Sequence, residues 1–124
     1  KLLKVTVELL AVIDRSLAIA KLDFTAAFSK ARAEISSDYP FLSPTSESFD
    51  YSHGKIKMTE RINPKIFIGG IVEALKRILD KLALNPKFAK VHGQTIQRLQ
   101  MMMSKRTSVY DTLSITPQLK RLVN

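Results

Sequence analysis

The residues best suited to bind another molecule lie in the last third of the chain, where basic and amide side chains recur at helical spacing. On a helix over residues 86–106 they share one side, and apolar side chains fill the opposite side. Lysine, arginine and glutamine contact phosphates and base edges, or the carboxylates of an acidic protein. The candidate binding residues are Lys87, Lys90, Gln94, Arg98, Lys105 and Arg106, with Lys120 and Arg121 farther along the chain. The same pattern is typical of the solvated side of a bundle helix.

The net charge of +9 is unevenly distributed along the chain. Residues 82–124 hold seven basic residues and a single acidic one, Asp111, so an acidic partner would be sought there. A nucleic acid is one such partner, although the sequence has no clear helix-turn-helix and no zinc-ligand pattern. Among the aromatic residues, only Tyr51 and Tyr110 are expected to be exposed enough for base stacking.

Two histidines and a glycine pair could also carry chemistry, and each has a structural explanation. His92 falls on the apolar side of its helix, where a lone histidine is expected to be a core residue. His53 lies at a predicted turn, and two histidines without paired carboxylates do not indicate a metal site. Gly69-Gly70 could offer backbone amides to a phosphate, but the other residues of a phosphate-binding loop are missing. Close approach of the β-hairpin or of a partner also explains this pair.

Catalytic groups are not evident in the sequence. The chain contains no cysteine, which excludes disulfides, thiolate metal ligands and cysteine nucleophiles. It has no Gly-x-Ser-x-Gly motif, and its carboxylates mostly lie next to basic residues rather than as isolated pairs in apolar surroundings. We expect no enzyme activity, no cofactor, no metal and no small-molecule substrate.

The N-terminal part of the chain is predicted to form a helical hairpin. Apolar spacing indicates a helix over residues 2–21 and a second one from Phe24 to about residue 37, with Asp23 as its N-cap. The first helix is apolar over an unusually wide arc, which is typical of a helix central in a core or shared with a partner. One row on it is a candidate interaction surface, covered by the rest of the domain or by another copy. The row consists of Leu2, Val5, Leu9 and Ile13.

The C-terminal half is predicted to be helical because three helix starts are marked by proline. Asn63-Pro64 starts a helix over residues 64–84, and Asn85-Pro86 starts the helix over residues 86–106. Thr116-Pro117 starts a last short helix. Between the two helical regions, apolar residues alternate on both sides of a turn with Gly54, which predicts a β-hairpin. The fold class is therefore mainly α, with four to five helices and one β-hairpin inserted near residues 48–59.

The length of 124 residues predicts a single domain. Because the chain starts with Lys1 rather than methionine, we expect it to be part of a longer protein. Charges interrupt its most apolar stretch, so no transmembrane segment is expected, and we predict a cytoplasmic location. The predicted function is a non-catalytic protein–protein interaction domain with a regulatory or oligomerisation role. The alternative is a nucleic-acid-binding domain that uses the basic side of residues 86–106.

Overall fold

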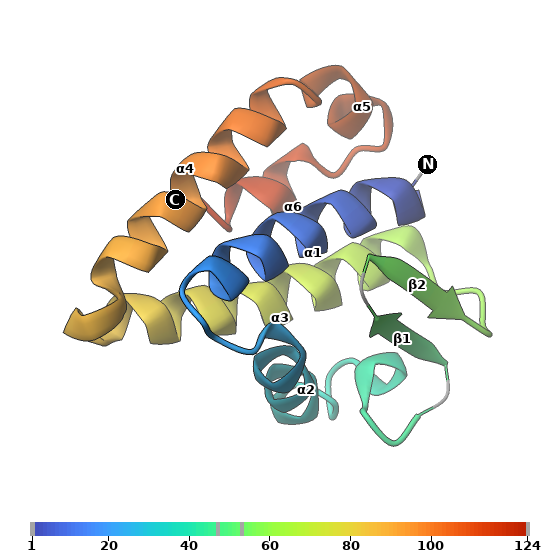
Figure 1. The fold of residues 1–124 in the computed structure, drawn as a ribbon. Coiled ribbons are helices and arrows are strands. Elements are labelled where there is room, and N and C mark those ends of the chain that lie inside the picture. The colour runs from blue at the N-terminus through green and yellow to red at the C-terminus, as the bar shows by residue number, and fades with distance from the viewer. Residues whose placement is uncertain (1, 47, 53, 124) are drawn as a thin grey trace.

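The computed structural model describes residues 2–46, 48–52 and 54–123 and confirms a mainly α fold with an inserted β-hairpin (Figure 1). Its elements in chain order are α1 (Leu2–Ile19), α2 (Phe24–Glu34), η1 (Pro40–Leu42), β1 (Phe49–Ser52), β2 (Lys55–Met58), α3 (Pro64–Leu84), η2 (Pro86–Phe88), α4 (Ala89–Ser104), α5 (Thr107–Thr112) and α6 (Thr116–Lys120). The η elements are short 3-10 helices. Helix α5 and the 3-10 helix η1 were not predicted from the sequence.

Helix α3 is the centre of the fold, because α1, α2, α4 and α6 all pack against it. Figure 1 shows α1 and α3 running side by side, with α4 and α5 on one side and α2 and the hairpin on the other. One face of α3 is apolar and is buried along the whole length of the helix. Its members are Phe67, Ile68, Ile71, Val72, Ala74, Leu75, Ile78, Leu79 and Leu82.

Asparagine and aspartate side chains start the helices as predicted. The Asp23 carboxylate accepts a hydrogen bond from the Ala26 N–H at 3.2 Å, and the Asn63 side chain accepts one from the Lys65 N–H at 2.9 Å. The Asn85 side chain accepts from the N–H of Lys87 at 3.0 Å. Asn85-Pro86 starts the 3-10 turn η2, so α4 itself begins three residues later than the predicted helix.

The hairpin packs one face against α1 and α2. Its strands are antiparallel, and Gly54 in the turn has a φ of 84°, which glycine adopts without strain. Phe49 and Tyr51 point inward, and the Tyr51 ring makes an edge contact with Phe24 at 5.7 Å between ring centroids. The predicted turn residue His53 lies outside the described residues.

The proposed interaction row of α1 belongs to the core. Val5 is 2% exposed, and Leu9 and Ile13 are 0% exposed, while Leu2 is half-buried. The cover comes from this chain, because α4 runs antiparallel along α1, with Arg98 at Ser16 and Arg106 at Glu8. This corrects the interpretation of the row as an interaction surface: no second copy is needed to bury it.

Gly70 is explained by close approach of the segment around η1 rather than of the hairpin. A Cβ placed on Gly70 would lie 2.9 Å from Leu42 Cδ1, 3.0 Å from Tyr39 Cδ1 and 3.1 Å from Phe41 Cζ. Real Cβ atoms do not approach neighbours so closely, and Leu42 is fully buried and cannot move freely. The missing side chain is therefore what lets this segment pack on α3.

Gly93 provides a matched control for Gly70, because it also lies in a helix and a Cβ on it would meet nothing within 4 Å. Gly93→Ala is expected to stabilise the protein by about 0.5–1 kcal/mol through helix propensity. Gly70→Ala gains the same term but overpacks the core, so we expect it to be about 1–3 kcal/mol less stable than Gly93→Ala. Urea unfolding measures both, and an equal gain from the two substitutions would contradict the packing described for Gly70.

Candidate interaction surface

Part of the predicted binding set lies together on the solvent side of α4. Leu99 and Thr95 are buried on the side of α4 that faces the bundle, which leaves the opposite side exposed. We call this exposed strip the α4 face and define it as Lys87, Lys90, Gln94, Gln97, Met101 and Lys105. None of its lysines forms an ion pair with another described residue. Their charge is therefore available to a partner.

Two predicted binding arginines turn toward α1 instead. Arg98 is half-buried, and its Nη1 donates a hydrogen bond to the Ser16 hydroxyl at 3.0 Å. The Nη2 of Arg106 lies 3.1 Å from a carboxylate oxygen of Glu8. The hydrogen bond with Glu8, and then its charge, raise the pKa of the Arg106 guanidinium above its ordinary value. Both side chains join α4 and its end to α1.

The remaining predicted residues, Lys120 and Arg121, lie at the end of α6. Arg121 is directed toward α3, where its Nη2 lies 3.4 Å from a Glu73 carboxylate oxygen. Glu73 also pairs with Arg77, four residues later on α3, at 3.8 Å. Lys120 is exposed and makes no ion pair with a described residue. Arg121 is therefore part of a surface ion-pair network on α3 rather than of the α4 face.

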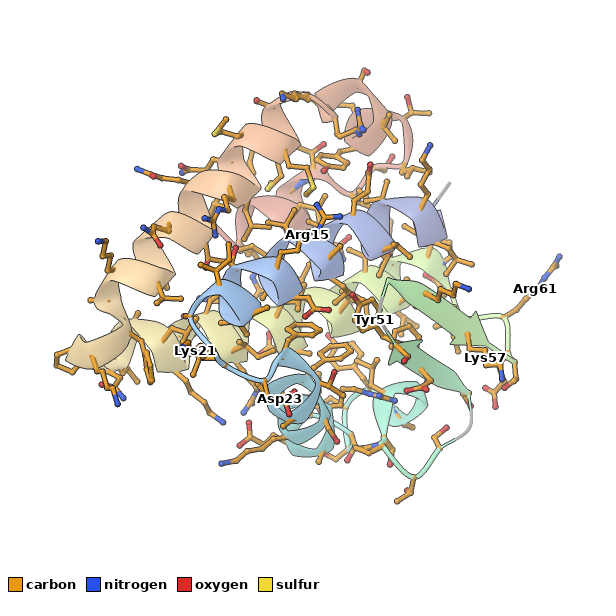
Figure 2. The ribbon with its side chains drawn as sticks, viewed as in Figure 1. Arg15, Lys21, Asp23, Tyr51, Lys57 and Arg61 are labelled. Carbon is orange, nitrogen blue, oxygen red and sulfur yellow. The ribbon has the colours of Figure 1, made fainter. Side chains whose placement is uncertain are left out.

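Tyr51 and Tyr110 are not available for base stacking, contrary to the expectation from the sequence. They are 4% and 2% exposed, because Tyr51 is an inward residue of β1 and α5 turns Tyr110 into the core. Figure 2 shows Tyr51 between the hairpin and the helices, and its hydroxyl donates a hydrogen bond to Asp14 at 3.1 Å. Burial, and then the Asp14 charge, raise the pKa of Tyr51, and burial likewise raises the pKa of Tyr110.

Because the pKa values of Tyr51 and Tyr110 are raised, we expect the free energy of unfolding to fall in alkaline solution. A phenol whose folded-state pKa lies above its ordinary value of 10.0 stabilises the fold fully below pH 10. That contribution is lost as the pH rises through 10 toward the folded-state pKa. Urea unfolding midpoints measured from about pH 8 to about pH 11.5 should therefore fall, and the fall should be shallower in Tyr51→Phe. An identical pH profile in Tyr51→Phe would contradict the buried hydroxyl.

The histidine and glycine residues that were considered for chemistry do not form a binding site in the part of the chain that the structure describes. His92 is only half-buried in α4 and is not one of the buried core residues, so the expectation that it belongs to the core is not met in full. Gly70 is covered by Tyr39, Phe41 and Leu42, which leaves no room for a phosphate there. Among residues 2–46, 48–52 and 54–123, no cluster of three or more histidine, aspartate or glutamate side chains is arranged to hold a metal ion.

Sequence reasoning missed a second group of basic residues, on the hairpin side, that form no ion pair with a described residue. Lys55 and Lys57 occupy the exposed positions of β2, and Arg61 follows the strand. Figure 2 shows Lys57 and Arg61 projecting away from the helices. The alternation of β2 is the signal that could have placed these lysines outward, because side chains of a strand point to opposite faces in turn.

Comparison of the chain with protein families, with curated proteins and with solved structures finds no match. Within the part of the chain that the structure describes, no helix has both the length and the apolar character needed to cross a membrane.

Proposed function

We propose that this chain is a non-catalytic protein-interaction domain whose α4 face contacts an acidic partner protein. The observation that supports this is the exposure of Lys87, Lys90 and Lys105 without ion-pair partners among the described residues. Residues 82–124 contain a single acidic residue, Asp111, so this part of the chain offers its own lysines little neutralising charge. Complementary charge of this kind steers association and selects partners.

A protein partner is favoured over a nucleic acid by the arrangement of the arginines. Arginine presents a planar fork that matches phosphates and guanine edges with two parallel hydrogen bonds, whereas the lysine ammonium group acts as a point charge with less geometric specificity. Arg98, Arg106 and Arg121 are already bound to Ser16, Glu8 and Glu73. In addition, the α4 face includes Met101, which is 63% exposed, and methionine is enriched in the cores of protein interfaces.

Nucleic-acid binding is the second candidate function, supported by the same free lysines and by the net charge of +9. Contacts from lysine to phosphate would be independent of base sequence. They would also depend steeply on salt, because each neutralised phosphate releases counterions.

Fluorescence anisotropy separates the two functions. Labelled random duplex DNA, single-stranded DNA and RNA are titrated with the protein over a series of salt concentrations. A protein-interaction domain should bind none of these probes at physiological salt. Binding at physiological salt would instead favour the second function, provided that the Lys90→Ala/Lys105→Ala variant flattens the slope of log affinity against log salt by about two.

A further inference from the structure

A groove lies at the end of the bundle where α1 meets α2 and α3 meets η2, and it has a volume of about 300 Å³. Its floor is apolar and is formed by Leu17, Leu22, Ala27, Ile78, Leu82 and Phe88. This volume is at the lower limit of sites that hold small organic groups. The groove can therefore accept one or two large apolar side chains.

The chain turns that close α1 and open α4 build the two walls of the groove. At the end of α1, the Leu22 N–H donates a hydrogen bond to the Leu17 carbonyl at 2.8 Å, and Lys21 has a φ of 62°. This helix-ending motif folds Leu22 back against Leu17. On the other side, the η2 turn that follows Asn85 places Phe88 at the groove.

The rim of the groove is mainly basic. Lys30 is exposed and forms no ion pair with a described residue, while Lys81 shares Glu34 with Arg77. Lys87 lies beside the groove, with its Nζ 5.8 Å from the centre of the Phe88 ring. The carboxylate among the lining residues is that of Asp23, at the α1–α2 corner in Figure 2, and it already caps α2. The free charge around the apolar floor is therefore positive.

We propose that this groove binds a short segment of a partner protein in which one or two large apolar residues are flanked by acidic residues. The apolar side chains enter the groove over Leu22 and Phe88, and the flanking carboxylates face Lys30 and Lys87. This inference rests on the proposed function for the class of partner, and it adds a second site that meets the α4 face at Lys87.

The test uses three labelled eight-residue peptides and the whole chain. One peptide carries a Leu-Phe pair between acidic residues, the second has Ala-Ala in place of Leu-Phe, and the third has lysine in place of each acid. The first should bind with a Kd of about 100 µM and shift the amide resonances of Leu22, Ala27 and Phe88. The second and third should bind at least tenfold more weakly.

Variants identify the site. Ala27→Trp fills the groove and should weaken binding of the first peptide at least tenfold, and Lys30→Glu should weaken it about threefold. Thr25→Trp, at an exposed position of the same helix that does not line the groove, is the control and should bind as the wild type does. Far-ultraviolet circular dichroism checks that each variant is folded.

Three results would overturn the proposal: no resonance shifts at about 1 mM peptide, equal binding of the lysine peptide, or unchanged binding by folded Ala27→Trp. Self-association that Ala27→Trp abolishes would also overturn it, because the occupant would then be a second copy. A Lys90→Glu/Lys105→Glu variant should keep the peptide affinity within about twofold, since neither lysine lines the groove. Failure of the groove is thus measured separately from failure of the α4 face.

Discussion

Leu9→Lys is expected to unfold the domain. Leu9 is 0% exposed in the middle of α1, and its row was a candidate interaction surface from the sequence. Loss of a buried leucine costs about 2–5 kcal/mol, and a buried, unpaired ammonium group adds several kcal/mol. Domains of this size have a total stability of about 5–15 kcal/mol. Circular dichroism and amide resonance dispersion measure the loss of structure.

Leu3→Lys is the matched control for this prediction, because Leu3 lies on the same helix and is 45% exposed. Its free energy of unfolding should change by less than about 0.5 kcal/mol. A folded Leu9→Lys protein that has lost only self-association would restore the interaction surface on α1 and would contradict the packing of α4 against it.

Arg32→Met is expected to destabilise the domain by about 2–5 kcal/mol, because it leaves two buried carbonyls without donors. Arg32 is 6% exposed; its Nε donates to the Leu42 carbonyl and its Nη2 to the Phe49 carbonyl, both at 2.8 Å. Hydrogen-bonded and non-hydrogen-bonded pairs alternate along an antiparallel ladder, and in this register Phe49 and Met58 form a non-hydrogen-bonded pair. The carbonyl of Phe49 therefore points away from β2, to the free edge of the hairpin. Urea unfolding measures the loss.

Arg77→Met controls for the loss of an arginine charge. Arg77 is on the surface of α3, where it pairs with Glu34 at 3.6 Å and its side chain is 43% exposed, so its removal should cost less than about 1 kcal/mol. Equal costs at the two positions would mean that the hydrogen bonds from Arg32 to the carbonyls of Leu42 and Phe49 do not stabilise the fold.

The surroundings of Arg32 act on its guanidinium in opposite directions. Burial lowers the pKa of Arg32, and the Asp50 carboxylate opposes this shift. The guanidinium also lies 5.3 Å from the centre of the Phe49 ring.

The helices and the hairpin were predictable because local chemistry specifies them. Asp23, Asn63 and Asn85 cap helix starts, and Gly54 supplies the positive φ of the hairpin turn. Helix α5 was not predictable in the same way, since neither Arg106, its N-cap residue, nor any other side chain caps its start. Its position depends on Tyr110 entering the core, which is a tertiary effect.

The binding surface was only partly predictable, because helical spacing gives the side of a helix but not its neighbours. Lys90, Gln94 and Lys105 are exposed as the spacing of α4 indicates. Arg98 lies near the boundary of that side and Arg106 follows the end of α4, and the antiparallel α1 provides Ser16 and Glu8 to bind them. These pairs join residues more than eighty positions apart, so no local pattern contains them.

The same limit applies to the apolar row of α1 and to the groove. A helix that is apolar over a wide arc is consistent with a central position and with an interface, and only the packing of the other elements against α1 decides that Leu9 and Ile13 are core. The groove combines residues from α1, α2, α3 and η2 with Leu22 of the α1–α2 turn. Leu22 and Phe88 are partly buried hydrophobic residues, and no local sequence pattern indicates that they line the same groove.

Site-specific cross-linking tests the proposed function most directly. A photoreactive phenylalanine analogue is placed at Gln97, in the middle of the α4 face, and at Thr25 on α2 as the control. After irradiation in the cells that make this protein, position 97 should give an adduct with a defined protein that resists nuclease, and position 25 should not. An adduct at position 97 that contains nucleic acid, the same adducts from both positions, or no adduct at all would contradict a protein-interaction role for the α4 face.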